Sequence, residues 1–168
     1  MINKDQLLDK CEAMTLLCTK ACTYWSMVKF CFNILLVLTS SAMCIINCIS
    51  GDANSMKIPN IIVNAISVLI MSLNHSVKAS EKIERFKRLS QQFMMLSQEI
   101  EGMDEAIEKE KYVILLLKYD NLIQDCAFED MPLKCKHLVA KMYNDAEKYI
   151  PVRLNGTIGN IVRKNNIV

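Results

Sequence analysis

Two long stretches of the chain are apolar and almost free of charge. Residues 30–50 contain no Asp, Glu, Lys or Arg, and neither do residues 58–77, in which His75 is the one imidazole. A helix of about 20 residues is roughly 30 Å long, which matches the hydrocarbon thickness of a bilayer. The connecting segment 51–57 is polar and begins with glycine, a residue that commonly follows a helix end. The pattern predicts a transmembrane hairpin at 29–78, with spans at 30–50 and 58–77.

A second interpretation of the same stretches is that they are core helices of a soluble bundle. Asparagines interrupt both of them, at Asn33, Asn47, Asn60, Asn64 and Asn74. Against this, buried helices of soluble bundles rarely run through about 20 residues without a charge on a solvated face. The membrane hairpin is the favoured interpretation, and the soluble bundle stays open as the alternative.

The ends of the two stretches carry residues that prefer the membrane interface. Aromatic rings and lysines suit this depth because each has an apolar body and a polar end. The predicted interfacial anchors are Tyr24, Trp25, Lys29, Lys57 and Lys78. Lysine and arginine are also far more frequent outside the hairpin than in its connection, where Lys57 stands alone. The positive-inside rule therefore places both termini in the cytoplasm.

Polar residues recur at helical spacing within the two stretches and predict a polar face on each helix. These residues are Asn33, Ser40 and Asn47 in the first stretch and Asn60, Asn64 and Ser67 in the second. An unpaired amide in hydrocarbon is unfavourable, so we expect these side chains to face another helix. Two interpretations are open. The face packs within the hairpin, or it lines a pore when several hairpins assemble.

Helices with an apolar stripe are predicted on both sides of the hairpin. An amphipathic N-terminal helix occupies 1–28, and a cytoplasmic stalk with a core helix occupies 79–125. The stalk seam repeats every three or four residues, as in a coiled coil, at Ile83, Phe86, Ser90, Phe93, Ser97 and Ile100. Because an antiparallel hairpin brings its ends together, we expect the stalk to pack on the N-terminal helix. The two serines would permit close approach or a polar contact between subunits.

The remaining segment, 126–168, is predicted to contain a C-terminal helix and a tail. Asp130 resembles an N-cap and Pro132 a first-turn proline, and Pro151 would end this helix. The whole chain has only four glycines and three prolines, and both residues interrupt regular helices. The predicted fold class is therefore all-α, with a two-helix transmembrane hairpin extended by long amphipathic cytoplasmic helices.

Little in the sequence indicates catalysis or a bound cofactor. The net charge of +2 and the few scattered aromatic residues argue against nucleic acid as a partner. No glycine-rich phosphate loop, GxSxG or HExxH motif occurs. Cys126, Cys135 and His137 come nearest to a ligand set, but their spacing matches no zinc-binding pair. We expect no catalytic residue, no cofactor and no metal site, and we expect the cysteines to behave as small apolar side chains.

The order of these parts resembles the SLATT family of two-transmembrane proteins from prokaryotic conflict systems, which has relatives in large DNA viruses. The likeness rests on residues 66–73, 78–89 and 96–100, and residues 118–123 with 131–132 are similar to the viral versions. The resemblance implies a membrane effector that assembles into a pore, or a membrane protein of a virion or infected cell. It brings no catalytic residues.

The sequence thus predicts a non-catalytic, multi-pass membrane protein that self-associates through its hairpin and stalk. The expected partners are the lipid bilayer, further copies of the chain and a protein bound at the cytoplasmic stalk. A SLATT-like effector or pore is the leading interpretation. The alternatives are a non-conducting viral membrane or scaffold protein, and a soluble helical binding module.

Overall fold

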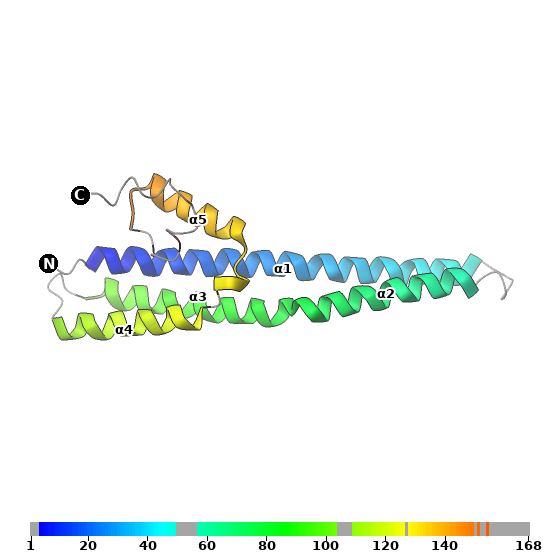
Figure 1. The fold of residues 1–168 in the computed structure, drawn as a ribbon, viewed down its shortest axis with the longest axis horizontal. Helices are drawn as coiled ribbons and strands as arrows, with labels where there is room; N and C mark the ends of the chain where they lie inside the picture. The colour runs from blue at the N-terminus through cyan, green and yellow to red at the C-terminus, as the bar shows by residue number, and fades with distance from the viewer. Residues whose placement is uncertain are drawn as a thin grey trace. The chain divides into compact units, whose positions relative to one another are not determined.

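The computed structural model describes residues 4–49, 57–103, 109–126, 128–149, 151 and 154, and every regular element within these residues is a helix (Figure 1). The elements in chain order are α1 (Lys4–Ile49), α2 (Lys57–Val77), α3 (Ala79–Glu101), α4 (Lys109–Asp125), the short 3-10 helix η1 (Phe128–Asp130) and α5 (Leu133–Asp145). The all-α fold class predicted from the sequence is confirmed.

The chain divides into two compact units. The helical body comprises Met1–Thr23 and Glu84–Val168, and the hairpin comprises Tyr24–Ile83. The sequence placed these boundaries at 28 and 78. The sequence also predicted an N-terminal helix at 1–28 that is separate from the first span at 30–50. The structure instead has one helix, α1, that contributes to both units. Helix α1 contains neither glycine nor proline, so no residue along it favours a break.

The core of the helical body is formed by one stripe from each of its helices. The fully buried large side chains of α1 and α3 include Met14, Leu17, Phe86, Phe93 and Ile100. Met14 and Leu17 are three residues apart, and the three α3 residues recur every seven, about two helical turns, as expected for amphipathic helices that pack on one another. Helix α4 joins them through Tyr119, whose ring meets that of Phe93 edge to face at 6.0 Å.

The stalk seam predicted at α3 is used inside the helical body. Phe86, Phe93 and Ile100 are completely buried, and the Ser90 hydroxyl lies 2.8 Å from that of Thr19 and donates to the Thr15 carbonyl at 3.3 Å. Ser97 donates to the Met94 carbonyl of its own helix. The N-terminal and stalk helices therefore pack together as expected, and Ser90 supplies a polar contact between them within one chain.

The beginning of α5 differs from the prediction. Pro132 occupies the N-cap position rather than the first turn, no side chain caps the helix, and Asp130 belongs to η1. Helix α5 ends at Asp145, ahead of Pro151. Residues 51–56 of the predicted connection 51–57 and, apart from Leu154, the tail at 152–168 lie outside the described residues.

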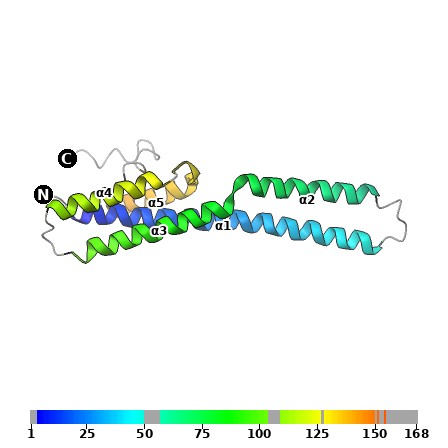
Figure 2. The same ribbon diagram turned by 90° about the horizontal axis from the view of Figure 1, so that it is seen from below.

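The hairpin pairs α2 with the later part of α1, and the two helices run alongside each other in both views (Figures 1 and 2). Helix α2 nearly coincides with the predicted span, beginning one residue earlier and ending at the same Val77. It is separated from α3 by Lys78 alone, whose φ of 51° lies in the left-handed region. This conformation interrupts regular helix at the point where the charge-free stretch ends.

Candidate membrane-spanning hairpin

Two helical segments, one within Lys4–Cys48 and one within Lys57–Glu101, are long and apolar enough to cross a membrane. The most apolar part of the first segment is 0% buried inside the molecule, and that of the second segment is 6% buried. A core helix of a soluble protein passes the same test of length and composition, but it buries most of this part against its neighbours. The exposure of both segments distinguishes them from core helices.

One row of side chains on α1 packs toward α2. Its members are half-buried and follow one another at spacings of three and four residues: Val28, Phe32, Leu36, Thr39, Met43 and Ile46. The side chains on either side of this row are exposed, with Ala42 as the half-buried exception. We call these six residues the packed row of α1.

Helix α2 contributes a matching row that contains most of its protected polar side chains. The packed row of α2 is Asn60, Val63, Ser67, Ile70, Asn74 and Val77, of which Ile70 is buried and the others are half-buried. The Asn60 amide donates to the Asn47 side-chain oxygen at 3.2 Å, which joins the two helices near their connected ends. The buried Asn60 Oδ1 has no hydrogen-bond partner in the structure.

The six residues of the predicted polar faces therefore do not share one environment. Asn60 and Ser67 lie in the packed row of α2, and Asn47 meets Asn60 although it remains exposed. Asn33, Ser40 and Asn64 are exposed on the outside of the hairpin. Ser40 and Ser67 also satisfy their hydroxyls locally, on carbonyls one turn earlier in their own helices.

Four of the five predicted interfacial anchors lie toward the end of the hairpin where its chain enters and leaves, whereas Lys57 begins α2 at the opposite, connected end. The rings of Tyr24 and Trp25 meet edge to face at 5.4 Å, and the Lys82 ammonium lies 4.2 Å from the centre of the Trp25 ring. Lys78 is exposed and pairs with Glu81 at 3.5 Å. Lys29 and Lys57 are exposed as well. Lys82 is not among the predicted anchors, because its contact with Trp25 depends on the pairing of segments far apart along the chain.

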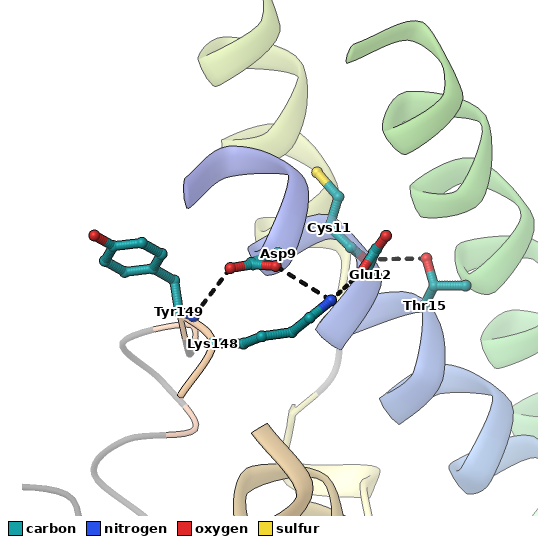
Figure 3. A network of polar contacts seen from close by, with 6 residues as sticks. All are labelled: Asp9, Cys11, Glu12, Thr15, Lys148 and Tyr149. Atoms are coloured by element: carbon teal, nitrogen blue, oxygen red, sulfur yellow. Dashed lines mark hydrogen bonds and ion pairs between the residues drawn. The ribbon is translucent and has the colours of Figure 1, made fainter. Parts of the chain in front are cut away.

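A polar network in the helical body fastens the segment after α5 to the start of α1 (Figure 3). The Lys148 ammonium lies 3.1 Å from Glu12 and 3.5 Å from Asp9, and the Tyr149 backbone N–H donates to Asp9 at 3.2 Å. The hydrogen bond with Glu12 raises the pKa of Lys148 above its ordinary value. No pattern in the sequence predicts this contact, because Asp9 and Tyr149 are 140 residues apart.

Buried thiols in the helical body form part of its core. Burial raises the pKa of Cys11 to about 12. A hydrogen bond with the Cys126 thiol, together with burial, raises the pKa of Cys18. A thiol held in its neutral form is a poor nucleophile and a poor metal ligand. Among the described residues, no group of three His, Cys, Asp or Glu side chains lies close enough to hold a metal ion.

Comparison of the chain with protein-family models, with curated proteins and with solved structures finds no match. We therefore infer function from the chemistry and exposure of the two units themselves.

Proposed function

We propose that this chain is a non-enzymatic integral membrane protein whose hairpin crosses a lipid bilayer. The observation that supports the proposal best is the exposure of the hairpin's apolar side chains, since the most apolar parts of its two helices are 0% and 6% buried. Soluble monomers rarely expose a contiguous apolar patch of more than a few hundred Å². Hydrocarbon is the solvent in which such a surface is stable, because both helices satisfy their backbone hydrogen bonds internally.

Both termini are proposed to lie in the cytoplasm, with the helical body in water. The orientation follows from the lysines and arginines that flank the hairpin, and the cluster of Tyr24, Trp25 and Lys82 is placed at the cytoplasmic interface. Protease treatment of sealed membrane vesicles of known orientation tests this arrangement. A tag at either terminus should be removed from the cytoplasmic face only. Protection of one terminus would contradict the hairpin topology.

The proposed action is physical: several copies assemble in the membrane and form a conducting pore, as the resemblance to SLATT effectors implies. Exposed amides within the spans, at Asn33 and Asn64, support assembly because lipid offers them no hydrogen-bond partner. Three of the apolar side chains of the stalk seam, Phe86, Phe93 and Ile100, are buried inside the helical body, and Ile83 is half-buried in the hairpin. Assembly is therefore assigned to the hairpin.

Release of a trapped fluorescent dye from vesicles containing the purified protein tests conduction. We expect leak that rises steeply with the protein-to-lipid ratio, because a pore requires several copies. Replacing the exposed amide, Asn64→Leu, should change the leak, whereas Leu69→Ile at another exposed position of α2 should leave it unchanged. Vesicles that incorporate the protein fully but release no dye would rule out the pore.

A second candidate function, a non-conducting scaffold, is supported by an apolar surface on the helical body. Val113, Ile114 and Leu117 of α4 are all exposed, as suits a site for a protein partner. The scaffold predicts a cross-linked partner without leak, and loss of that partner when all three residues are replaced by serine. The Leu133→Ser variant, at an exposed leucine of α5, is the matched control. Retention of the partner in the triple variant would contradict this assignment.

A further inference from the structure

The hairpin has two outer sides of different chemistry, which the packed rows make it possible to define. The asparagine side consists of the residues within 30–50 and 60–77 that directly follow a packed-row position. On α1 it comprises Asn33, Val37, Ser40, Cys44 and Asn47, and on α2 it comprises Ile61, Asn64, Val68, Met71 and His75, all of them exposed.

The leucine side consists of the residues within the same two ranges, 30–50 and 60–77, that directly precede a packed-row position. On α1 it comprises Cys31, Leu35, Leu38, Ala42 and Ile45, and on α2 it comprises Ile62, Ile66, Leu69, Leu73 and Ser76. No asparagine occurs among these ten residues, and Ser76 lies next to the end of α2.

Residues that follow the packed row of α1 lie on the same side of the hairpin as residues that follow the packed row of α2, and the same holds for the residues that precede the two rows. Each step along a right-handed α-helix turns by about 100°. The two helices run in opposite directions side by side (Figure 2). A two-fold axis perpendicular to the plane of the pair exchanges antiparallel helices and leaves each side of the pair in place. The residues that follow the packed rows therefore form one continuous side, and those that precede them form the other.

The asparagine side contains amides that the chain itself does not satisfy. Within the part of the chain that the structure describes, the side-chain amides of Asn33 and Asn64 make no hydrogen bond, whereas the Asn60 amide donates to the Asn47 side-chain oxygen. An amide carries both a donor and an acceptor, so a second copy of the same residue complements it. In hydrocarbon, such a bond across a helix interface replaces an unsatisfied polar group.

The α1 part of this side also has the spacing and the shape of a helix-packing seam. Its five residues follow one another at intervals of four, three, four and three, the repeat by which helices pack along a shared seam. Small residues at its centre, Ser40 and Cys44, permit close approach of two backbones. They line a shallow groove of about 390 Å³ together with Leu36, Val37 and Ser41.

We propose that the hairpins of two copies of this chain pack against each other through their asparagine sides, with Ser40 and Cys44 at the point of closest approach and the leucine sides facing lipid. This inference rests on the proposed membrane location, because an exposed amide is satisfied by water in solution. It adds to that proposal the identity of the partner and of the surface.

Native cysteines allow a direct test, since Cys44 lies on the asparagine side and Cys31 on the leucine side, both exposed. Copper-phenanthroline with oxygen joins two close thiols as a disulfide, and oxygen accepts the two electrons and two protons released. In membranes, the C31S/C48S variant, which keeps Cys44, should yield a cross-linked dimer. The C44S/C48S variant, which keeps Cys31, is the matched control and should yield no more dimer than the C31S/C44S/C48S variant does.

Equal or stronger cross-linking through Cys31, or no cross-linking through Cys44, would overturn the proposal. Alkaline carbonate extraction of each variant separates this failure from that of the proposed function. Release from the membrane would contradict the membrane location itself. Retention without cross-linking at Cys44 would contradict only the asparagine-side interface.

Removing the exposed amides supplies a second measurement. The double variant N33L/N64L should lower the fraction cross-linked at Cys44 by about fivefold, because interhelical hydrogen bonds in membranes contribute modestly. Ser76→Leu makes a similar polar-to-leucine change on the leucine side and should leave that fraction unchanged. Equal effects from the two changes would count against pairing through the amides.

Discussion

One helix, α1, contributes to two units, and its apolar side chains are buried in one of them and exposed in the other. In the helical body, Leu7, Met14 and Leu17 of α1 are fully or almost fully buried, whereas beyond Ala21 no described side chain of the helix is buried. In the hairpin, Phe30, Val37 and their apolar neighbours are exposed. The helical body thus buries the apolar stripe of α1, whereas the hairpin leaves its apolar side chains uncovered, which is the surface that the proposed membrane location requires.

The distribution of charge supports the same contrast. The helical body carries exposed ion pairs, such as Lys118 with Glu99 at 2.6 Å between α3 and α4. Within the hairpin, Asp, Glu, Lys and Arg are absent from 30–50 and 58–77. Each unit therefore has the surface that its proposed solvent demands.

The largest expected effect comes from placing charge on the lipid-facing side of the hairpin. The double variant L38K/L69K should lose association with vesicles in a flotation assay, because a lysine at mid-membrane costs about 3 kcal/mol. The control M95K changes a methionine of the helical body that is 66% exposed, and it should float as the wild type does. Normal flotation of L38K/L69K would place the hairpin outside the bilayer.

Removal of a core ring should destabilise the helical body and leave the hairpin folded. Phe93 is completely buried, so Phe93→Ala should lower the free energy of unfolding by about 3–5 kcal/mol. Urea titration in detergent, followed by circular dichroism, should show early loss of part of the helix signal. Met95→Ala, at an exposed position, should change stability by less than about 0.5 kcal/mol. Similar losses from both variants would contradict the assigned core.

Buried thiols should resist alkylation in the folded protein. Since burial raises the pKa of Cys11 to about 12, Cys11 should react at pH 8 roughly a thousandfold more slowly than an ordinary thiol, and Cys18 should also be slow. Mass spectrometry after timed maleimide treatment can assign each site. Unfolding in guanidinium is the control and should make both reactive. Rapid labelling of Cys11 in folded protein would contradict its place in the core.

The smallest effect is expected from the exposed network around Lys148. Lys148→Met should destabilise the helical body by less than about 1 kcal/mol, because solvent screens exposed ion pairs. The folded-state pKa of Lys148 is raised, so its contribution is complete below its ordinary pKa of 10.5 and is lost as the pH rises through the folded value. The stability difference between wild type and variant, measured by urea unfolding, should therefore persist at pH 7 and vanish as the pH rises through the folded-state pKa of Lys148.

The control variant Lys134→Met, at an exposed position of α5, should neither lower the stability of the helical body nor change how that stability depends on pH. A difference between wild type and Lys148→Met that grows with rising pH would contradict the stated sign.

The charge pattern predicted α2 almost to the residue, because the charge-free stretch and the helix end together at Val77. The boundary between the two units within α1 had no such marker, since the helix passes through it without glycine or proline. The environments of Asn60 and Asn64 were not predictable either. The two are only about 40° apart around the helix, and the position of α1 decides which of them is covered. Spacing alone cannot supply that information.

The most direct test of the central claim is alkaline carbonate extraction of membranes from cells that express the full chain with a tag. We expect the protein to stay in the membrane pellet and to be released by detergent, because the exposed hairpin is proposed to span the bilayer. Release into the supernatant by carbonate alone would contradict it, and would show that the apolar surface of Tyr24–Ile83 is covered by something other than lipid.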